Sequence, residues 1–153
     1  MIILKTIADT QKLLTHHKEN GKAIGFVPTM GALHQGHISL VEQAKQTVDV
    51  VVVSIFVNPT QFNDPKDLEK YPITIEADTE KLVAAGVDVL FLPSVAEMYP
   101  TEASRQMDYD LGYMDTVLEA AARPGHFKGV ALVVKKLLDI VFLLMTKKSL
   151  QLH

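Results

Sequence analysis

Two histidines spaced three residues apart are the strongest candidates for chemistry in this sequence. His34 and His37 flank Gly36 in the segment Phe26–His37, FVPTMGALHQGH. At the start of a helix, residues three apart lie on one face, and the free N–H groups and the helix dipole attract anions. Gly36 lets a phosphate approach the backbone, and imidazoles can donate hydrogen bonds to its oxygens. This arrangement suits a nucleotide whose α-phosphate is attacked, because donors held in place stabilise the charge that grows on the phosphoryl oxygens.

The histidine pair also admits plainer interpretations. His34 and His37 can be ordinary loop and helix-cap residues, an alternative that the H-x-G-H spacing by itself leaves open. Metal ligation needs a third ligand, and no carboxylate or further histidine lies nearby in the sequence. A P-loop is excluded because the Gly-Lys-Ser/Thr element is absent. The preceding apolar run and glycine-bearing turn favour the anion site.

Two carboxamides form a second candidate site. Asn58 and Gln61 follow an apolar run in the segment Ser54–Phe62, SIFVNPTQF. Carboxamides offer hydrogen-bond donors and acceptors without charge, which suits a small polyhydroxylated acid. The alternative is that both side chains only cap a turn, and this alternative is stronger for Asn58, which precedes Pro59.

A third candidate site lies in the segment Ala121–Val130, AARPGHFKGV. Pro124 and Gly125 predict a tight entry into a long helix. Arg123 and His126 could meet an anion at the start of that helix. It is equally open that the loop only orients the helix against a sheet.

The elements expected to position these sites alternate between strand and helix. The predicted strands are 23–27, 49–57 and 87–92, with 105–113 and 142–145 as weaker candidates, and the predicted helices are 7–20, 37–47, 75–85, 94–98, 114–121 and 127–140. The run 49–57 is β-branched on both faces, as in a buried central strand. Pro28 is expected to end the first strand, and 58–72 reads as a polar loop. The order predicts an α/β fold with an open parallel sheet, whose ligands lie beyond the carboxyl ends of the strands.

Composition excludes several other classes of protein. The 153 residues suffice for one domain, 48% are hydrophobic and the net charge is −3, so nothing indicates a nucleic acid or an acidic membrane as partner. Without cysteine, disulfides and thiolate sites are excluded. The apolar run in Met1–Lys5 is too short for a signal peptide, and Lys135, Lys136 and Asp139 interrupt the longest apolar stretch, Val130–Met145. A cytoplasmic location is the default expectation.

All three segments resemble blocks of one enzyme family, the pantothenate synthetases. VPTMGALHQGH looks like the signature of that family, whereas H-x-G-H alone is shared with the wider nucleotidyltransferase and class I aminoacyl-tRNA synthetase superfamily. SIFVNPTQF is similar to a second block, and ARPGHFKGV to a third in which Ala122 replaces a serine. The resemblance implies a Rossmann-like parallel sheet of the nucleotidyltransferase kind over residues 1–145, with residues 146–153 as an atypical tail.

The resemblance also implies an activity. The family condenses (R)-pantoate with β-alanine through a pantoyl adenylate, using ATP and Mg²⁺, and tends to form homodimers. His34 and His37 would stabilise the phosphoryl transition state. The implied ATP-binding residues are Met30, Gly31, Ala32, Leu33, His34, Gln35, Gly36, His37 and Lys148, and the implied pantoate- and β-alanine-binding residues are Gln61, Asn58 and His126. Asp78 and the loop Asp64–Pro72 are expected to be structural or interface residues.

The C-terminal residues depart from the family pattern. Lys148 matches an ATP-contacting lysine, but Thr146, Ser149 and Leu152 replace a glycine, an aspartate and a glutamine. The family's Ser-Ser-Arg segment and C-terminal lid domain have no counterpart in the chain. We therefore expect weak activity or none, and apolar surface exposed along Val130–Met145. Another H-x-G-H nucleotidyltransferase and a non-catalytic nucleotide-binding fragment remain the alternatives.

Overall fold

A parallel four-stranded sheet forms the centre of residues 1–62, 64–105 and 126–142, the part of the chain that the computed structural model describes. Its strands are β1 (Ile2–Leu4), β2 (Ile24–Thr29), β3 (Val50–Ile55) and β4 (Val89–Phe91). They lie in the order β1-β4-β3-β2, and every neighbouring pair is parallel. The predicted α/β fold with a parallel sheet is confirmed.

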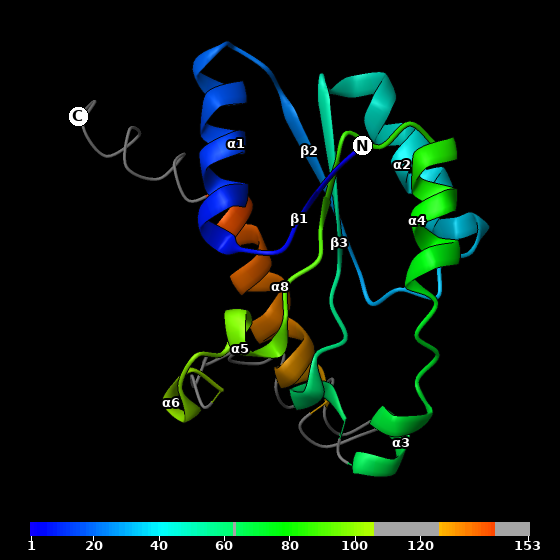
Figure 1. The fold of residues 1–153 in the computed structure, drawn as a ribbon, viewed down its shortest axis with the longest axis vertical. Helices are drawn as coiled ribbons and strands as arrows, with labels where there is room; N and C mark the ends of the chain where they lie inside the picture. The colour runs from blue at the N-terminus through cyan, green and yellow to red at the C-terminus, as the bar shows by residue number, and fades with distance from the viewer. Residues whose placement is uncertain (63, 106–125, 143–153) are drawn as a thin grey trace.

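Helices cover both faces of this sheet. The longer ones are α1 (Ile7–Glu19), α2 (Gln35–Thr47), α4 (Ile75–Ala84) and α8 (His126–Phe142). The short ones are η1 (Pro59–Gln61), α3 (Pro65–Lys70), α5 (Val95–Met98) and α6 (Glu102–Arg105). Figure 1 shows α1 and α8 on one side of the sheet and α2 and α4 on the other. The sheet is therefore the middle of three layers.

Strand β3 is buried along its whole length. All six of its residues are buried, as the two-sided β-branched run predicts. Val51, Val53 and Ile55 belong to the core on the α2 and α4 side. Val50 and Val52 point to the other side, where they pack in one cluster with Leu14 of α1 and Val141 of α8.

Strand β2 continues through Pro28, contrary to the prediction that proline ends it. Pro28 pairs in register with Ser54, and Thr29 pairs with Ile55. A proline lacks the N–H that an interior strand must donate, but β2 lies at an edge of the described sheet, where that loss costs little. The strand therefore ends one residue beyond Pro28, at Thr29, where the histidine-bearing loop begins.

Several element boundaries differ from the prediction. Strand β1 was not predicted, because three residues give too short a pattern. The expected loop 58–72 contains η1 and α3, each of which begins with a proline behind a capping side chain. Phe142 ends α8 and is not in a strand. The predictions for 106–113, 114–121 and 143–145 concern residues outside the described ranges. Arg105, the first residue of the predicted strand 105–113, is helical.

The expectation of exposed apolar surface along α8 is wrong for its described part. Leu132, Val133, Leu137, Ile140 and Val141 are all buried. Val133, Leu137, Ile140 and Val141 belong to clusters with residues of the sheet, α1 and the segment around Met98. Leu138 is the one large apolar side chain of residues 129–142 that is exposed. Within the described ranges, no helix combines the length and the apolar character needed to cross a bilayer.

Candidate active site

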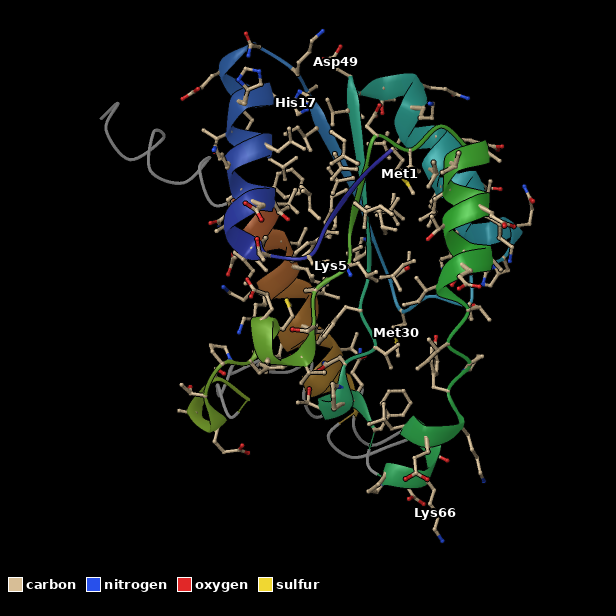
Figure 2. The ribbon with its side chains drawn as sticks, viewed as in Figure 1. Met1, Lys5, His17, Met30, Asp49 and Lys66 are labelled. Atoms are coloured by element: carbon tan, nitrogen blue, oxygen red, sulfur yellow. The ribbon has the colours of Figure 1, made fainter. Side chains whose placement is uncertain are left out.

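The loop that joins β2 to α2 adopts a backbone conformation that is rare outside glycine. Gly31 has φ of 82°, and Ala32 has φ of 50°. A non-glycine residue in this region costs on the order of 1–3 kcal/mol, so contacts elsewhere must hold it. Figure 2 shows Met30, in this loop, toward the end of the sheet near α3, whereas Asp49, just before β3, lies at the opposite end. The loop therefore lies at the carboxyl ends of the strands, where ligands of such sheets bind.

The carboxylate of Asp78 on α4 holds this loop. Its Oδ2 accepts a hydrogen bond from the amide of Ala32 and its Oδ1 accepts one from Leu33, both at 2.8 Å. Thr74 donates its hydroxyl to Oδ2 at 3.0 Å, and the Asp78 side chain is fully buried. A carboxylate removed from water in this way is stabilised by the donors that surround it. Asp78 thus has the structural role that the sequence suggested, and it acts directly on the loop of the candidate site.

The rings of His34 and His37 lie against each other at the start of α2. Their centroids are 4.1 Å apart, with 45° between the ring planes. His34 is the N-cap residue and His37 is the third residue of the helix. The side chain of His34 accepts a hydrogen bond from the amide of Gly36, and that of His37 accepts one from the amide of His34, in the manner of a capping box. The prediction that the two rings share one face of a helix start is confirmed.

The backbone sets the tautomer of both imidazoles. Nδ1 of His34 accepts from the amide of Gly36 at 3.1 Å, and Nδ1 of His37 accepts from the amide of His34 at 3.3 Å. A neutral imidazole has one proton, so a ring whose Nδ1 accepts a hydrogen bond has that proton on Nε2. Both rings therefore have an Nε2–H group left to donate to a ligand.

The surroundings of His37 keep its ring neutral. Partial burial lowers the pKa of His37 below its ordinary value, and the neighbouring His34 lowers it further. Asp78 opposes these two effects by raising the pKa. The net result is a pKa below the ordinary value of about 6.5, so near pH 7 His37 is neutral.

A cavity of about 380 Å³ brings the first two candidate sites together. Its lining comes from the end of β2 and the loop after it, the start of α2, the second site, the end of α3 and one face of α8. The lining residues are Pro28, Thr29, Met30, Gly31, Ala32, His34, His37, Phe56, Gln61, Tyr71, Val130, Val133, Val134 and Leu137. Among the predicted ATP-binding residues, Leu33, Gln35 and Gly36 do not line it. Leu33 is buried in the core, and the other two are exposed.

Gln61 and Asn58 have different positions. Gln61 lines the cavity and is 5% exposed. Asn58 is fully buried and does not line it: its Nδ2 donates to the carbonyl of Gly129 at 3.2 Å, and its Oδ1 accepts from the Thr60 amide and hydroxyl. This placement favours the alternative in which Asn58 caps a turn, and its contacts join that turn to α8.

Gly129 allows α8 to approach η1 closely. A Cβ atom on Gly129 would lie 2.6 Å from the carbonyl oxygen of Thr60, a distance that packed atoms do not adopt. The glycine of the third segment thus lets α8 form a wall of the cavity. His126 begins α8, but its side chain, Arg123 and Lys148 lie outside the described residues, so their expected roles stay predictions.

Sequence reasoning missed the apolar wall of the site. Val130, Val133, Val134 and Leu137 follow the spacing of one helix face, and they line the cavity together with Phe56 and Tyr71. The helical spacing was visible in the sequence. Which face of the sheet α8 covers, and therefore what this stripe contacts, depends on the three-dimensional path of the chain.

The described residues contain no group of three or more His, Asp or Glu side chains able to hold a metal ion. The carboxylate nearest the loop, that of Asp78, is already surrounded by backbone and hydroxyl donors. These residues do not fit a resident metal ion. The interpretation of the histidine pair as ligands of a metal therefore finds no support in the described part of the chain.

Comparison with known proteins identifies the family. The model of the pantoate-β-alanine ligase family matches residues 2–145. Pantothenate synthetases of Cytophaga hutchinsonii and Bacteroides fragilis are each 52% identical to the chain over 141 residues, which is 92% of this chain and 49% of theirs. The chain thus spans about half the length of the curated relatives it matches.

Solved structures agree with this assignment. A pantoate-β-alanine ligase from Francisella tularensis, in complex with β,γ-ATP and β-alanine, is 47% identical with a TM-score of 0.83, over 92% of this chain and 53% of that one. The pantothenate synthetase of Thermus thermophilus is 44% identical with a TM-score of 0.81, over 92% of this chain and 49% of that one. The chain belongs to the pantoate-β-alanine ligase family.

Proposed function

We propose that this chain contains the site at which pantoate is activated by ATP before it is joined to β-alanine. The observation behind the proposal is the pair of Nε2–H donors of His34 and His37 at the start of α2. Both residues line a cavity that Gln61 also lines. The Francisella tularensis relative, solved in complex with β,γ-ATP and β-alanine, supports the choice of ligands. Because the chain spans about half of its relatives' length, its own activity is a proposal.

The histidine pair suits the phosphate groups of ATP. Two rings held 4.1 Å apart, each with its Nδ1 bound to a backbone amide, offer two donors, and the start of α2 contributes its dipole. As the α-phosphorus is attacked, negative charge grows on the phosphoryl oxygens, where donors held in place lower the barrier. Mg²⁺ enters as part of the MgATP substrate, bound to phosphate oxygens, because the described residues do not fit a resident metal.

The apolar part of the cavity lining suits pantoate. Its branched carbon chain has two methyl groups, which fit the apolar stripe formed by Val130, Val133, Val134 and Leu137. Its hydroxyls and carboxylate need polar partners, and the carboxamide of Gln61 lines the same cavity. The arrangement is that of a mostly apolar pocket with a few polar groups that orient the ligand.

The proposed reaction has two steps. A carboxylate oxygen of pantoate attacks the α-phosphorus of ATP, the bond from that phosphorus to the bridging oxygen breaks, and pyrophosphate leaves. The amine of β-alanine then attacks the acyl carbon of pantoyl adenylate, loses a proton and expels AMP, giving pantothenate. His34 and His37 donate hydrogen bonds from Nε2–H to the phosphoryl oxygens in the first step.

Pyrophosphate and AMP release test the proposal. The 153-residue chain is incubated with MgATP, with and without pantoate, and then with β-alanine, beside a full-length relative. We expect saturable ATP binding and pantoate-dependent pyrophosphate release well below the rate of the relative. Pyrophosphate release that does not depend on pantoate, or that is faster with CTP than with ATP, would indicate the site of another kind of nucleotidyltransferase. Absence of both nucleotide binding and release would make the chain a non-catalytic member.

We also propose that the chain forms a homodimer, as the family resemblance implies. Light scattering coupled to size-exclusion chromatography measures the molar mass directly. A mass near twice 16.9 kDa is expected, and a mass of one chain at high micromolar concentration would refute it.

A further inference from the structure

We propose that Asp78 and Lys81 of α4 are positioning residues for the histidine pair, and we call these two residues the α4 clamp. They lie three residues apart, so both project from the same face of the helix. Asp78 accepts from the amides of Ala32 and Leu33, as described above. Lys81 donates from Nζ to the carbonyl oxygen of Leu33 at 2.6 Å. Three backbone groups directly before His34 are therefore held from one helix.

The contact of Lys81 reaches His37 through a single peptide unit. The carbonyl of Leu33 and the amide of His34 belong to the same planar peptide, and in the trans form they point in opposite directions. Lys81 bonds to the carbonyl, while the amide donates to Nδ1 of His37 at 3.3 Å. The lysine thus fixes the direction of the N–H group that selects the Nε2–H tautomer of His37. A charged donor on the carbonyl also polarises the amide and strengthens the bond that it donates.

Asp78 holds the loop residues just before the peptide that joins Leu33 to His34. Ala32 has a positive φ, and the amides of Ala32 and Leu33 point to one carboxylate. Successive amides that converge in this way form a concave site for an anion, and here Asp78 occupies it. These amides are therefore not available to a ligand, which can instead contact the imidazoles of His34 and His37. The first of these residues is exposed, the second is half-buried, and both line the cavity. The carboxylate holds the turn from which His34 enters the helix as its N-cap.

Nitrogen spectra of the imidazole rings test the clamp. ¹⁵N–¹H correlation spectra that link ring nitrogens to ring carbons report which nitrogen is protonated. In the unaltered chain, we expect His34 and His37 to show protonated Nε2. In Lys81→Met, which removes an exposed lysine and leaves the helix intact, His37 should change to a mixture of both tautomers. Lys81→Arg keeps a donor and should restore most of the original signal.

Matched controls separate positioning from general loss of structure. Lys45 donates to the carbonyl of Gly86, also at 2.6 Å, so Lys45→Met removes a similar bond away from the loop. Asp78→Asn weakens the hold on the amides of Ala32 and Leu33 and should also give His37 a mixture of tautomers. Its control is Asp88→Asn, because Asp88 accepts from the amide of Val51 at 2.8 Å. Neither control should alter the ring signals of His37. Unchanged His37 signals in folded Lys81→Met, or equal changes in Lys45→Met, would overturn the inference.

ATP affinity gives a second readout, and only this readout rests on the proposed function. If the clamp prepares the rings for phosphate, Lys81→Met should bind ATP about tenfold more weakly than Lys45→Met. A tautomer change in a chain that does not bind ATP would support the clamp and refute the proposed function. ATP affinity that stays equal in both variants, although the tautomer changes, would overturn the role of the clamp in ligand binding.

Discussion

The imidazole of His37 accepts a hydrogen bond from the backbone amide of His34 at 3.3 Å, while the two rings stand 4.1 Å apart. One contact therefore performs two tasks. It satisfies an amide that would otherwise lack a partner at the helix start, and it leaves the Nε2–H of His37 for a ligand. The H-x-G-H pattern is thus both a helix cap and a set of hydrogen-bond donors, so the two interpretations of the sequence are compatible.

The free energy of unfolding should depend on pH through His37. Burial and His34 lower its folded pKa below the ordinary value of about 6.5, although Asp78 opposes them, so the unfolded chain takes up the proton first as pH falls. The contribution of neutral His37 is fully present above about pH 6.5 and is lost as pH falls through its folded pKa. Protonation of Nδ1 also breaks the bond from His34.

Urea unfolding at about pH 7.5 and about pH 5 measures this dependence. His37→Gln is the matched variant, because glutamine at this helix position accepts the same backbone bond and does not titrate. The original chain should lose more stability over this interval than His37→Gln. An identical loss in both proteins would show that His37 does not contribute.

Gly129→Ala should destabilise the protein, although alanine normally favours a helix over glycine by about 1 kcal/mol. The new methyl group would lie 2.6 Å from the carbonyl oxygen of Thr60, so α8 and η1 must separate. We expect a net loss of about 1–3 kcal/mol in the free energy of unfolding. Gly21→Ala is a useful comparison, because its methyl group meets nothing within 4 Å and its cost comes from the positive φ alone. Gly129→Ala that is as stable as the original chain would contradict the packing.

Asn58→Ala should mainly reduce stability, whereas Gln61→Ala should mainly reduce ligand binding. Asn58 is fully buried and bonds to Gly129 and Thr60, so its removal leaves buried groups without partners and should cost about 1–3 kcal/mol of stability. Gln61 lines the cavity, so its removal should mainly weaken pantoate binding. Thermal unfolding and pantoate titration, run on both variants, separate the effects. If Asn58→Ala were as stable as the original chain but lost pantoate binding, Asn58 would be a ligand-binding residue after all.

The sequence predicted the parts of the site that are local in the chain. The spacing of His34 and His37 was enough to place both rings at one helix start, and the two-sided apolar run 49–57 was enough to predict the buried strand β3. Both patterns depend on neighbours within a few residues. Such patterns survive folding because tertiary contacts add to them rather than override them.

The parts that the sequence did not predict depend on contacts between distant residues. Asp78 lies 46 residues from Ala32, and nothing in the local pattern of α4 indicates that it reaches the loop. The stripe on α8 is visible as helical spacing, but only the fold places it at the cavity. Local rules predict that a strand ends at Pro28. Strand β2 continues through this residue because it lies at an edge of the described sheet, which the sequence alone does not reveal.

Calorimetric titration with ATP tests most directly whether the histidine pair binds phosphate. His34→Ser/His37→Gln removes both imidazoles and keeps a Ser-x-x-Gln capping box, so α2 can still begin in place. His16→Ala/His17→Ala is the control, because this second pair of rings lies on α1, and Figure 2 shows His17 far from Met30. We predict saturable binding to the original chain and to the control, and loss of binding in His34→Ser/His37→Gln. No binding to the original chain at about 1 mM ATP, or equal binding by all three proteins, would contradict the account.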